Sequence, residues 1–232
     1  MDMEYSVSCS YSNEIVKKEV EKKDMSFALI VVMDKEIYIA TDSRSTKIEW
    51  SGKKTFSDDY QKIVVIPEKN IAVLSTGFND FDGKTFAEIV SELPKEDIFN
   101  DLFLLAKKYE LKKREKTFIF TGSFRLNNEC EFVPIIQSTG IDEESGQLLY
   151  GYNETPGILY SLGAKYGTDL VKNTDPKSFK PETAVSQIEN FMKGIISISQ
   201  AFDNTVGGPI QMVRITPEKA EWVEGFKPDF IK

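Results

Sequence analysis

Histidine is missing from the 232 residues of this chain, and its absence removes a large part of ordinary catalytic chemistry. Ser-His-Asp and Cys-His mechanisms, histidine general bases and histidine-ligated metals all need an imidazole. Cysteine is almost as scarce, because Cys9 and Cys130 form no CxxC pair and are too few for a disulfide framework. We therefore predict two reduced thiols, no metal and no cofactor. An enzyme of this composition needs a base other than histidine.

A positive excess of charge and long apolar runs are also missing. The formal net charge is −8, which argues against a nucleic-acid partner. The basic stretch KKYELKKREK fits a phosphate-binding patch or, more simply, a solvated helix end. The longest strongly apolar run, Phe27 to Met33, is too short to span a bilayer, and the N-terminus has no signal-peptide pattern. These features predict a cytoplasmic protein without a membrane partner.

The hydrophobic pattern changes in an orderly way along the chain. Short apolar or alternating segments predict strands, and apolar residues at helical spacing predict helices. The predicted strands are Ser26–Val32, Ile37–Asp42, Gln61–Ile66, Ile71–Ser75, Thr117–Ser123, Glu131–Ser138, Gln147–Tyr150, Gly157–Ser161, Ile210–Thr216 and Ala220–Val223. The predicted helices are Asp80–Leu93, Asp97–Arg114, Ala164–Lys172 and Pro181–Ala201.

This order of elements predicts an α+β fold. Two antiparallel sheets would pack face to face with helices on their outer faces, as a four-layer αββα sandwich. Residues 1–25, which end in the charged stretch EIVKKEVEKKDM, form a predicted N-terminal arm or propeptide. Residues 26–232 show no repeat or linker and form one predicted domain.

Three segments resemble the proteasome-type N-terminal-nucleophile (Ntn) hydrolases in their order and spacing. SFALIVVMDKEIYIATDSRST resembles the opening of that family, where a hydroxyl residue begins strand one and an Asp-x-Arg ends strand two. QKIVVIPEKNIAVLSTGFND resembles the Lys-Ile strand, its loop and the next strand. FDNTVGGPIQMVRIT is similar to the Asp-x-x-x-Gly-Gly segment and the last strand pair. The resemblance spans residues 26–216 and implies an Ntn-hydrolase-like domain of a bacterial or archaeal proteasome-subunit-like protein.

The resemblance also implies how such a protein works without histidine. Ser26 would be the nucleophile, and its own α-amine would be the base. Asp42 lies sixteen positions later, as in the family, and would hold Lys62 in its charged form. A nearby ammonium favours the ionised hydroxyl. The implied substrate is a peptide or an amide.

Three further residues match accessory positions of the family. The backbone N–H of Gly77 would stabilise the oxyanion, Arg44 would lie beside the ion pair, and Asp203 matches a partner aspartate. Two positions depart from the pattern. Met25 replaces the glycine before the nucleophile, and Val206 replaces an auxiliary serine.

More than one function remains open at this point. Each motif by itself also fits ordinary structure, such as turn chemistry at residues 42–44 or an edge-strand charge at Lys62. If the arm is removed, the protein is a peptidase or an amidase; if it stays, the protein is a non-catalytic assembly subunit. We expect a homo-oligomer, with Phe99, Phe103 and Tyr109 on a packing surface.

Overall fold

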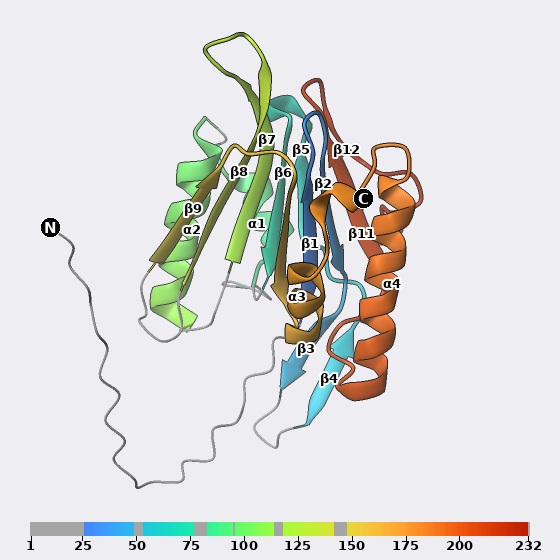
Figure 1. Ribbon diagram of the computed structural model, residues 1–232. Helices are drawn as coiled ribbons and strands as arrows, with labels where there is room; N and C mark the ends of the chain where they lie inside the picture. Colours follow the sequence, from blue (N-terminus) through green and yellow to red (C-terminus); the bar gives the residue numbers. More distant parts are fainter. Residues whose placement is uncertain are drawn as a thin grey trace, which may run out of the picture.

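The computed structural model describes residues 26–48, 53–76, 83–94, 96–113, 118–141 and 148–231 (Figure 1). The predicted arm, residues 1–25, lies outside these ranges, as does Gly77. The described residues form a mixed α+β fold whose strand pairs are all antiparallel. The predicted fold class is confirmed at this level.

Two five-stranded sheets contain most of the strands. The first sheet has the order β10-β1-β2-β11-β12 and the second has the order β5-β6-β7-β8-β9. The strands of the first sheet are β1 (Phe27–Val32), β2 (Ile37–Asp42), β10 (Ile158–Gly163), β11 (Ile210–Ile215) and β12 (Ala220–Trp222). Those of the second are β5 (Ile63–Ile66), β6 (Ile71–Thr76), β7 (Phe118–Leu126), β8 (Phe132–Ile141) and β9 (Leu148–Asn153).

Two of the helices begin three or more residues later than the sequence predicts. Helix α1 (Phe86–Glu92) starts after a capping box made by Thr85 and Glu88 rather than at Asp80. Helix α4 (Ala184–Phe202) starts three residues after Pro181, because the Thr183 N–H donates to the Lys180 carbonyl and closes a turn there. The remaining helices are α2 (Ile98–Lys113) and α3 (Lys165–Lys172), with short 3₁₀ turns η1 (Pro67–Lys69) and η2 (Pro176–Ser178).

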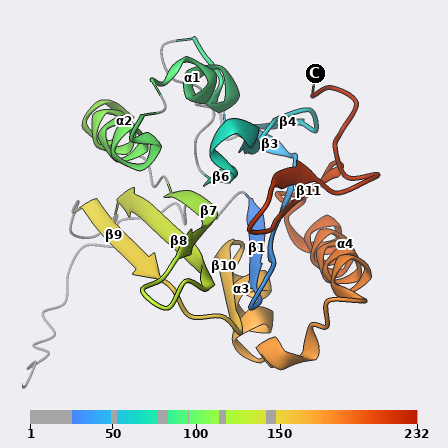
Figure 2. The ribbon, with the colours of Figure 1, turned by 90° about the horizontal axis from the view of Figure 1, so that it is seen from above.

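Three buried apolar clusters hold these elements together. One includes Ile39 of the first sheet and Leu74 of the second, so it lies between the sheets. Another joins Phe27 to Met192 of α4, and a third joins Val73 to Leu102 of α2. Figure 2 accordingly shows α4 on one side of the strands and α1 and α2 on the other. Every residue of β1 and β2 is buried, which explains why their sequences are almost continuously apolar.

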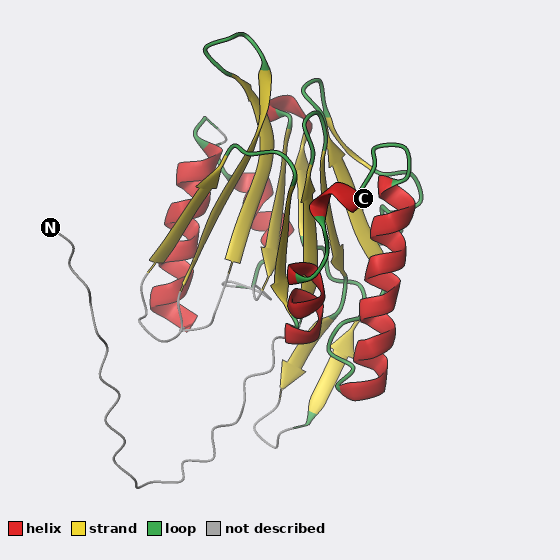
Figure 3. Ribbon diagram, viewed as in Figure 1, coloured by secondary structure: helices red, strands yellow, loops and turns green. Residues whose placement is uncertain are grey.

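A third, two-stranded sheet was not predicted. Its strands β3 (Ser45–Ile48) and β4 (Lys54–Ser57) pair with each other and project from the lower end of the molecule in Figure 3. The prediction of two sheets was wrong here because β4 is largely exposed and its sequence, KTFS, has no apolar pattern of a packed strand.

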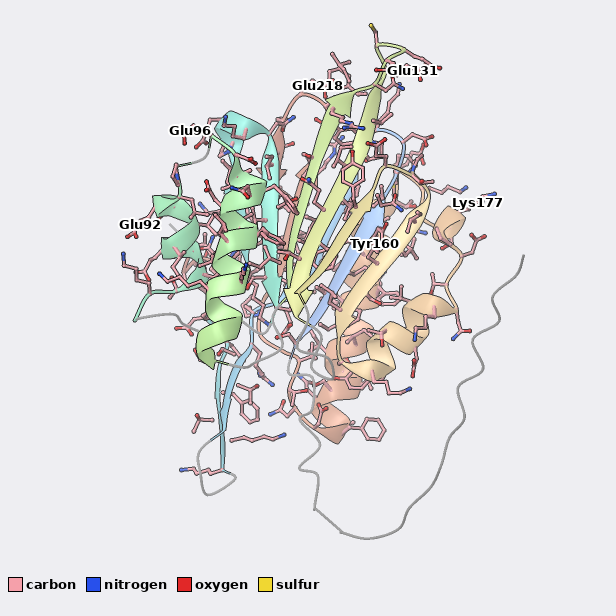
Figure 4. The ribbon with its side chains drawn as sticks, turned by 90° about the vertical axis from the view of Figure 1, so that its left-hand side faces the viewer. Glu92, Glu96, Glu131, Tyr160, Lys177 and Glu218 are labelled. Carbon is pink, nitrogen blue, oxygen red and sulfur yellow. The ribbon has the colours of Figure 1, made fainter. Side chains whose placement is uncertain are left out.

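The two ends of the sheets differ in what they carry. Figure 4 shows Glu131 and Glu218 near the upper end. Ser26 directly precedes β1 and Asp42 ends β2, so both lie at the opposite end, where the β3–β4 hairpin begins. The hydroxyl and carboxylate predicted to act together are therefore at the same end of two neighbouring inner strands, β1 and β2.

The predicted packing surface on α2 is only partly described. Phe99 and Phe103 are half-buried, Leu104 is exposed, and the side chain of Tyr109 lies outside the described residues. Across the described part of the chain, no helix combines the length and the apolar character needed to cross a membrane.

Candidate active site

Asp42 is the centre of the site, and it is completely buried. Its Oδ1 accepts hydrogen bonds from the Phe27 N–H at 3.0 Å and from Lys62 Nζ at 2.8 Å. Its Oδ2 accepts from the N–H groups of Arg44 and Gly207, each at 3.1 Å. A buried carboxylate is tolerated only when its acceptor positions are satisfied, and these four donors do so. Asp42 is thus held rigidly, and its hydrogen-bond partners extend beyond the local turn at residues 42–44.

Lys62 joins the two predicted partners. Its ammonium nitrogen lies 2.8 Å from Asp42 Oδ1 and 3.0 Å from Ser26 Oγ, and the residue is 3% exposed. The sequence predicts this proximity, but through neighbouring strands. Lys62 instead lies immediately before β5 of the second sheet, and its side chain reaches the ends of β1 and β2 in the first sheet. Lys62 directly precedes β5, an edge strand of the second sheet, but its side chain is buried and does not face solvent.

The environment of Lys62 weakens its hold on the proton. Burial lowers the pKa of the Lys62 ammonium below its ordinary value, although the charge and hydrogen bond of Asp42 oppose this shift. Asp58 also favours the charged form, and Arg44 disfavours it. A lysine with a lowered pKa next to a hydroxyl can either stabilise the alkoxide as an ammonium or accept a proton as an amine.

The backbone of Ser26 is fixed by the loop that follows β10. The Ala164 N–H donates to the Ser26 carbonyl at 2.8 Å. Gly163 has a φ of +94°, and a Cβ there would lie 1.8 Å from the Ser26 carbonyl oxygen. Only glycine permits both the left-handed conformation and this close approach. The position of the Ser26 hydroxyl therefore depends on a glycine far away in the sequence.

Arg44 contributes to the site as a structural clamp. Its guanidinium donates to both carboxylate oxygens of Asp58, at 2.6 and 2.7 Å, and to the Asn204 carbonyl at 3.0 Å. The hydrogen bond from Arg44 is the main reason that the pKa of the Asp58 carboxyl is lowered. The backbone N–H of Arg44 binds Asp42, while its guanidinium holds Asp58 and the loop at Asn204 beside the ion pair.

Asp203 organises the loop between α4 and β11. Its Oδ1 accepts from Ser199 Oγ at 3.0 Å and from the Thr205 hydroxyl and N–H at 2.9 and 3.1 Å. The Val206 N–H in turn donates to Ser199 Oγ at 2.8 Å. This loop delivers the Gly207 N–H to Asp42, so Asp203 is connected to the ion pair through the backbone.

Substituting Gly207 with alanine tests how tightly this loop packs. A Cβ at Gly207 would lie 2.4 Å from Arg44 Cζ, so the guanidinium would have to move. We expect the free energy of unfolding to fall by about 1–3 kcal/mol, as for other overpacked sites. Gly194→Ala on α4 is the control, because its Cβ would have nothing within 4 Å; alanine there should stabilise the helix by up to about 1 kcal/mol. Urea unfolding measures both, and equal stabilities would contradict the packing argument.

Other features of the site were missed or lie outside the described residues. Gly77, the predicted oxyanion donor, follows the last described residue of β6, Thr76. The hydroxyl of Tyr166 is buried near Ser199 and Thr205 and has no hydrogen-bond partner among the described residues, and burial raises its pKa. No sequence signal pointed to this tyrosine.

Neither a metal site in the described part of the chain nor a similar known protein identifies the chemistry of the site. Among the described residues, no group of acidic, cysteine or histidine side chains could hold a metal ion. No protein-family model matches the chain, and no curated protein matches it significantly.

Proposed function

We propose that this protein is an Ntn hydrolase that cleaves peptide or amide bonds with Ser26 as its nucleophile. The observation that carries the proposal is the buried contact of Lys62 Nζ with both Ser26 Oγ, at 3.0 Å, and Asp42 Oδ1, at 2.8 Å. A charged lysine is rarely buried without a partner, and here its other contact is a hydroxyl at the start of a strand. An ammonium in this position favours loss of the hydroxyl proton.

The finer fold assignment belongs to the same proposal. We infer a proteasome-like αββα arrangement of the two larger sheets and the helices. Three separate buried clusters support it, one between the sheets and one beneath the helices on each outer side. Such domains assemble through their helices, and the exposed Leu104 on α2 is consistent with a homo-oligomer.

The reaction follows from the geometry once Ser26 has a free α-amine. Ser26 Oγ attacks the substrate carbonyl carbon while its proton passes to that amine. The Lys62 ammonium stabilises negative charge on Oγ, and Asp42 holds the ammonium in place. Collapse of the tetrahedral intermediate expels the leaving amine with the proton and leaves an ester on Ser26. Water then hydrolyses the ester and restores the hydroxyl.

A non-catalytic assembly subunit is the second candidate. In the 232-residue chain the Ser26 nitrogen lies in a peptide bond with Met25, and an amide nitrogen cannot serve as a base. Val206, which is fully buried, supplies no hydroxyl to the site. In this function the ion pair of Lys62 with Asp42 would be purely structural.

The state of residue 26 in the cell separates the two candidates. We expect protein purified from its own host to begin at Ser26, because the proposed mechanism needs the free amine. N-terminal sequencing and intact mass determine this directly. A chain that retains residues 1–25 in full would favour the assembly subunit. A small-molecule amidase would show the processed N-terminus with hydrolysis of simple amides but not of peptides.

A further inference from the structure

Gln211 is a buried polar residue that the proposed mechanism does not use. It lies on β11, directly opposite Thr41 of β2, and has no exposed surface. The preceding residue, Ile210, is opposite Asp42. Gln211 therefore belongs to the first sheet and is one position away from the carboxylate at the centre of the site.

The side chain of Gln211 leaves its own sheet and binds the backbone of the other one. Its Oε1 accepts from the N–H of Lys62 at 2.9 Å and from the N–H of Ile63 at 3.2 Å. Its Nε2 donates to the Tyr60 carbonyl at 2.6 Å. Among the described strands, β5 is at the edge of the second sheet and pairs with β6 alone, so no second described strand lies beside these backbone groups. The glutamine amide takes the place of that strand.

These bonds hold the backbone of Lys62, the residue whose side chain reaches from the second sheet to Ser26 and Asp42 of the first. The Lys62 carbonyl accepts from the Ser75 N–H at 3.0 Å, which ties Lys62 to the second sheet. Gln211 ties the same residue to the first sheet, which carries Ser26 and Asp42. Two hydrogen bonds to its backbone therefore set the point from which the Lys62 side chain starts.

We propose that Gln211 is a positioning residue that sets the distance from Lys62 Nζ to Ser26 Oγ by holding the Lys62 backbone against the first sheet. The inference rests on the proposed function for its catalytic consequence, but the position of Lys62 can be measured without any substrate. A displacement of about 1 Å in a catalytic group can lower a rate by about 10²-fold.

Replacing Gln211 with methionine keeps the side-chain length and removes all three hydrogen bonds. The charged groups that face Lys62 are Asp42, Asp58 and Arg44, and none of them is changed. We expect the pKa of Lys62 to differ from its wild-type value, because a displaced ammonium changes both its burial and its distance from Asp42. NMR of protein labelled with ¹³C-lysine follows the titration, and the Lys62→Met variant identifies the signal. Hydrolysis by the chain that begins at Ser26 should fall by about 10²-fold, mainly in kcat.

Gln187→Met is the matched control. Gln187 also makes three hydrogen bonds, to the Lys180 N–H, the Thr183 hydroxyl and the Ser178 carbonyl, but it joins the start of α4 to the loop before it. Its substitution should lower stability and leave the Lys62 titration unchanged. If Gln211→Met also leaves that titration unchanged, Gln211 is merely structural and the proposal is overturned.

Gln211→Glu provides an independent test if the methionine variant does not fold. Its carboxylate can accept the same two N–H groups but cannot donate to the Tyr60 carbonyl. Its charge should raise the pKa of Lys62 above the wild-type value. Hydrolysis should stay within about tenfold of the wild-type rate, because the Lys62 backbone remains held. If hydrolysis instead falls as far as in Gln211→Met, although the bonds to the Lys62 and Ile63 N–H groups are kept, the proposal is overturned. Absence of hydrolysis in every variant, with the expected titrations, would refute the proposed function and leave the positioning role intact.

Discussion

Lys62→Met is expected to abolish hydrolysis and to destabilise the protein strongly. Methionine has a similar length, but it cannot donate to Ser26 Oγ, so the rate should fall by at least about 10²-fold. It also leaves the Asp42 carboxylate buried with one donor fewer. Breaking a buried ion pair costs about 3–5 kcal/mol of unfolding free energy. Steady-state hydrolysis by the chain that begins at Ser26 and urea unfolding measure the two effects.

A surface lysine gives the control for this substitution. Lys84 forms an ion pair with Glu92 in which both side chains are about half exposed. Lys84→Met should change the unfolding free energy by less than about 1 kcal/mol and leave hydrolysis unaffected. Adding Asp42→Asn to Lys62→Met should recover part of the lost stability, since the unpaired charge is gone, without restoring activity. A Lys62→Met variant that hydrolyses amides at the wild-type rate would remove Lys62 from the mechanism.

The second large effect concerns the free amine of Ser26. A chain that begins at Ser26 should hydrolyse amide or peptide substrates, whereas the 232-residue chain should be silent until the bond between Met25 and Ser26 is cleaved. The chemical reason is that a peptide nitrogen has no basic lone pair, and the chain has no histidine to replace it. Ser26→Ala in the shorter chain should be inactive, because it keeps the amine and loses the nucleophile. Assays with a broad set of amides and peptides measure all three proteins.

Equal activity of the 232-residue chain and of the chain that begins at Ser26 would contradict a role for the α-amine. It would instead point to Lys62 as the base, a chemistry that its lowered pKa also permits. The Ser26→Ala variant distinguishes this case from contamination, because it must be inactive under either mechanism. Silence of both chains with every substrate would favour the assembly subunit.

Local sequence patterns predict much of the fold and the proximity of Ser26 to Asp42. The apolar runs and the turn at residues 33–36 indicate that β1 and β2 pair, and that pairing alone places Ser26 near Asp42. Strand periodicity is a local property, so the hairpin β5–β6 is predicted equally well. The β3–β4 hairpin is missed because β4 is largely polar and exposed, and none of its four residues belongs to a buried apolar cluster.

The parts that escape prediction depend on contacts between distant segments. Lys62 lies next to a strand of a different sheet from Asp42, and the hydrophobic pattern of a strand does not show which part of the other sheet it will pack against. Gln211 interrupts the apolar strand IQMVRI, but a single glutamine in a strand does not reveal which backbone it binds. Asp58 is one acidic residue in a polar loop, and its pairing with Arg44 appears only when the hairpin is folded. Tyr166 looks like an ordinary helix residue until its hydroxyl is found among Ser199 and Thr205.

The most direct test of Ser26 as the nucleophile is to find where an acylating reagent attaches to the protein. The chain that begins at Ser26 is treated with a β-lactone, whose ring opens when a nucleophilic hydroxyl attacks its carbonyl and forms an ester. Peptide mass mapping then locates the added mass. The proposed mechanism predicts an adduct on Ser26 Oγ. The adduct should form at least about 10²-fold more slowly in Lys62→Met and at an unchanged rate in Lys84→Met. The mechanism would be contradicted if only other serines were labelled, or if Ser26 were labelled at the same rate in Lys62→Met as in the wild type.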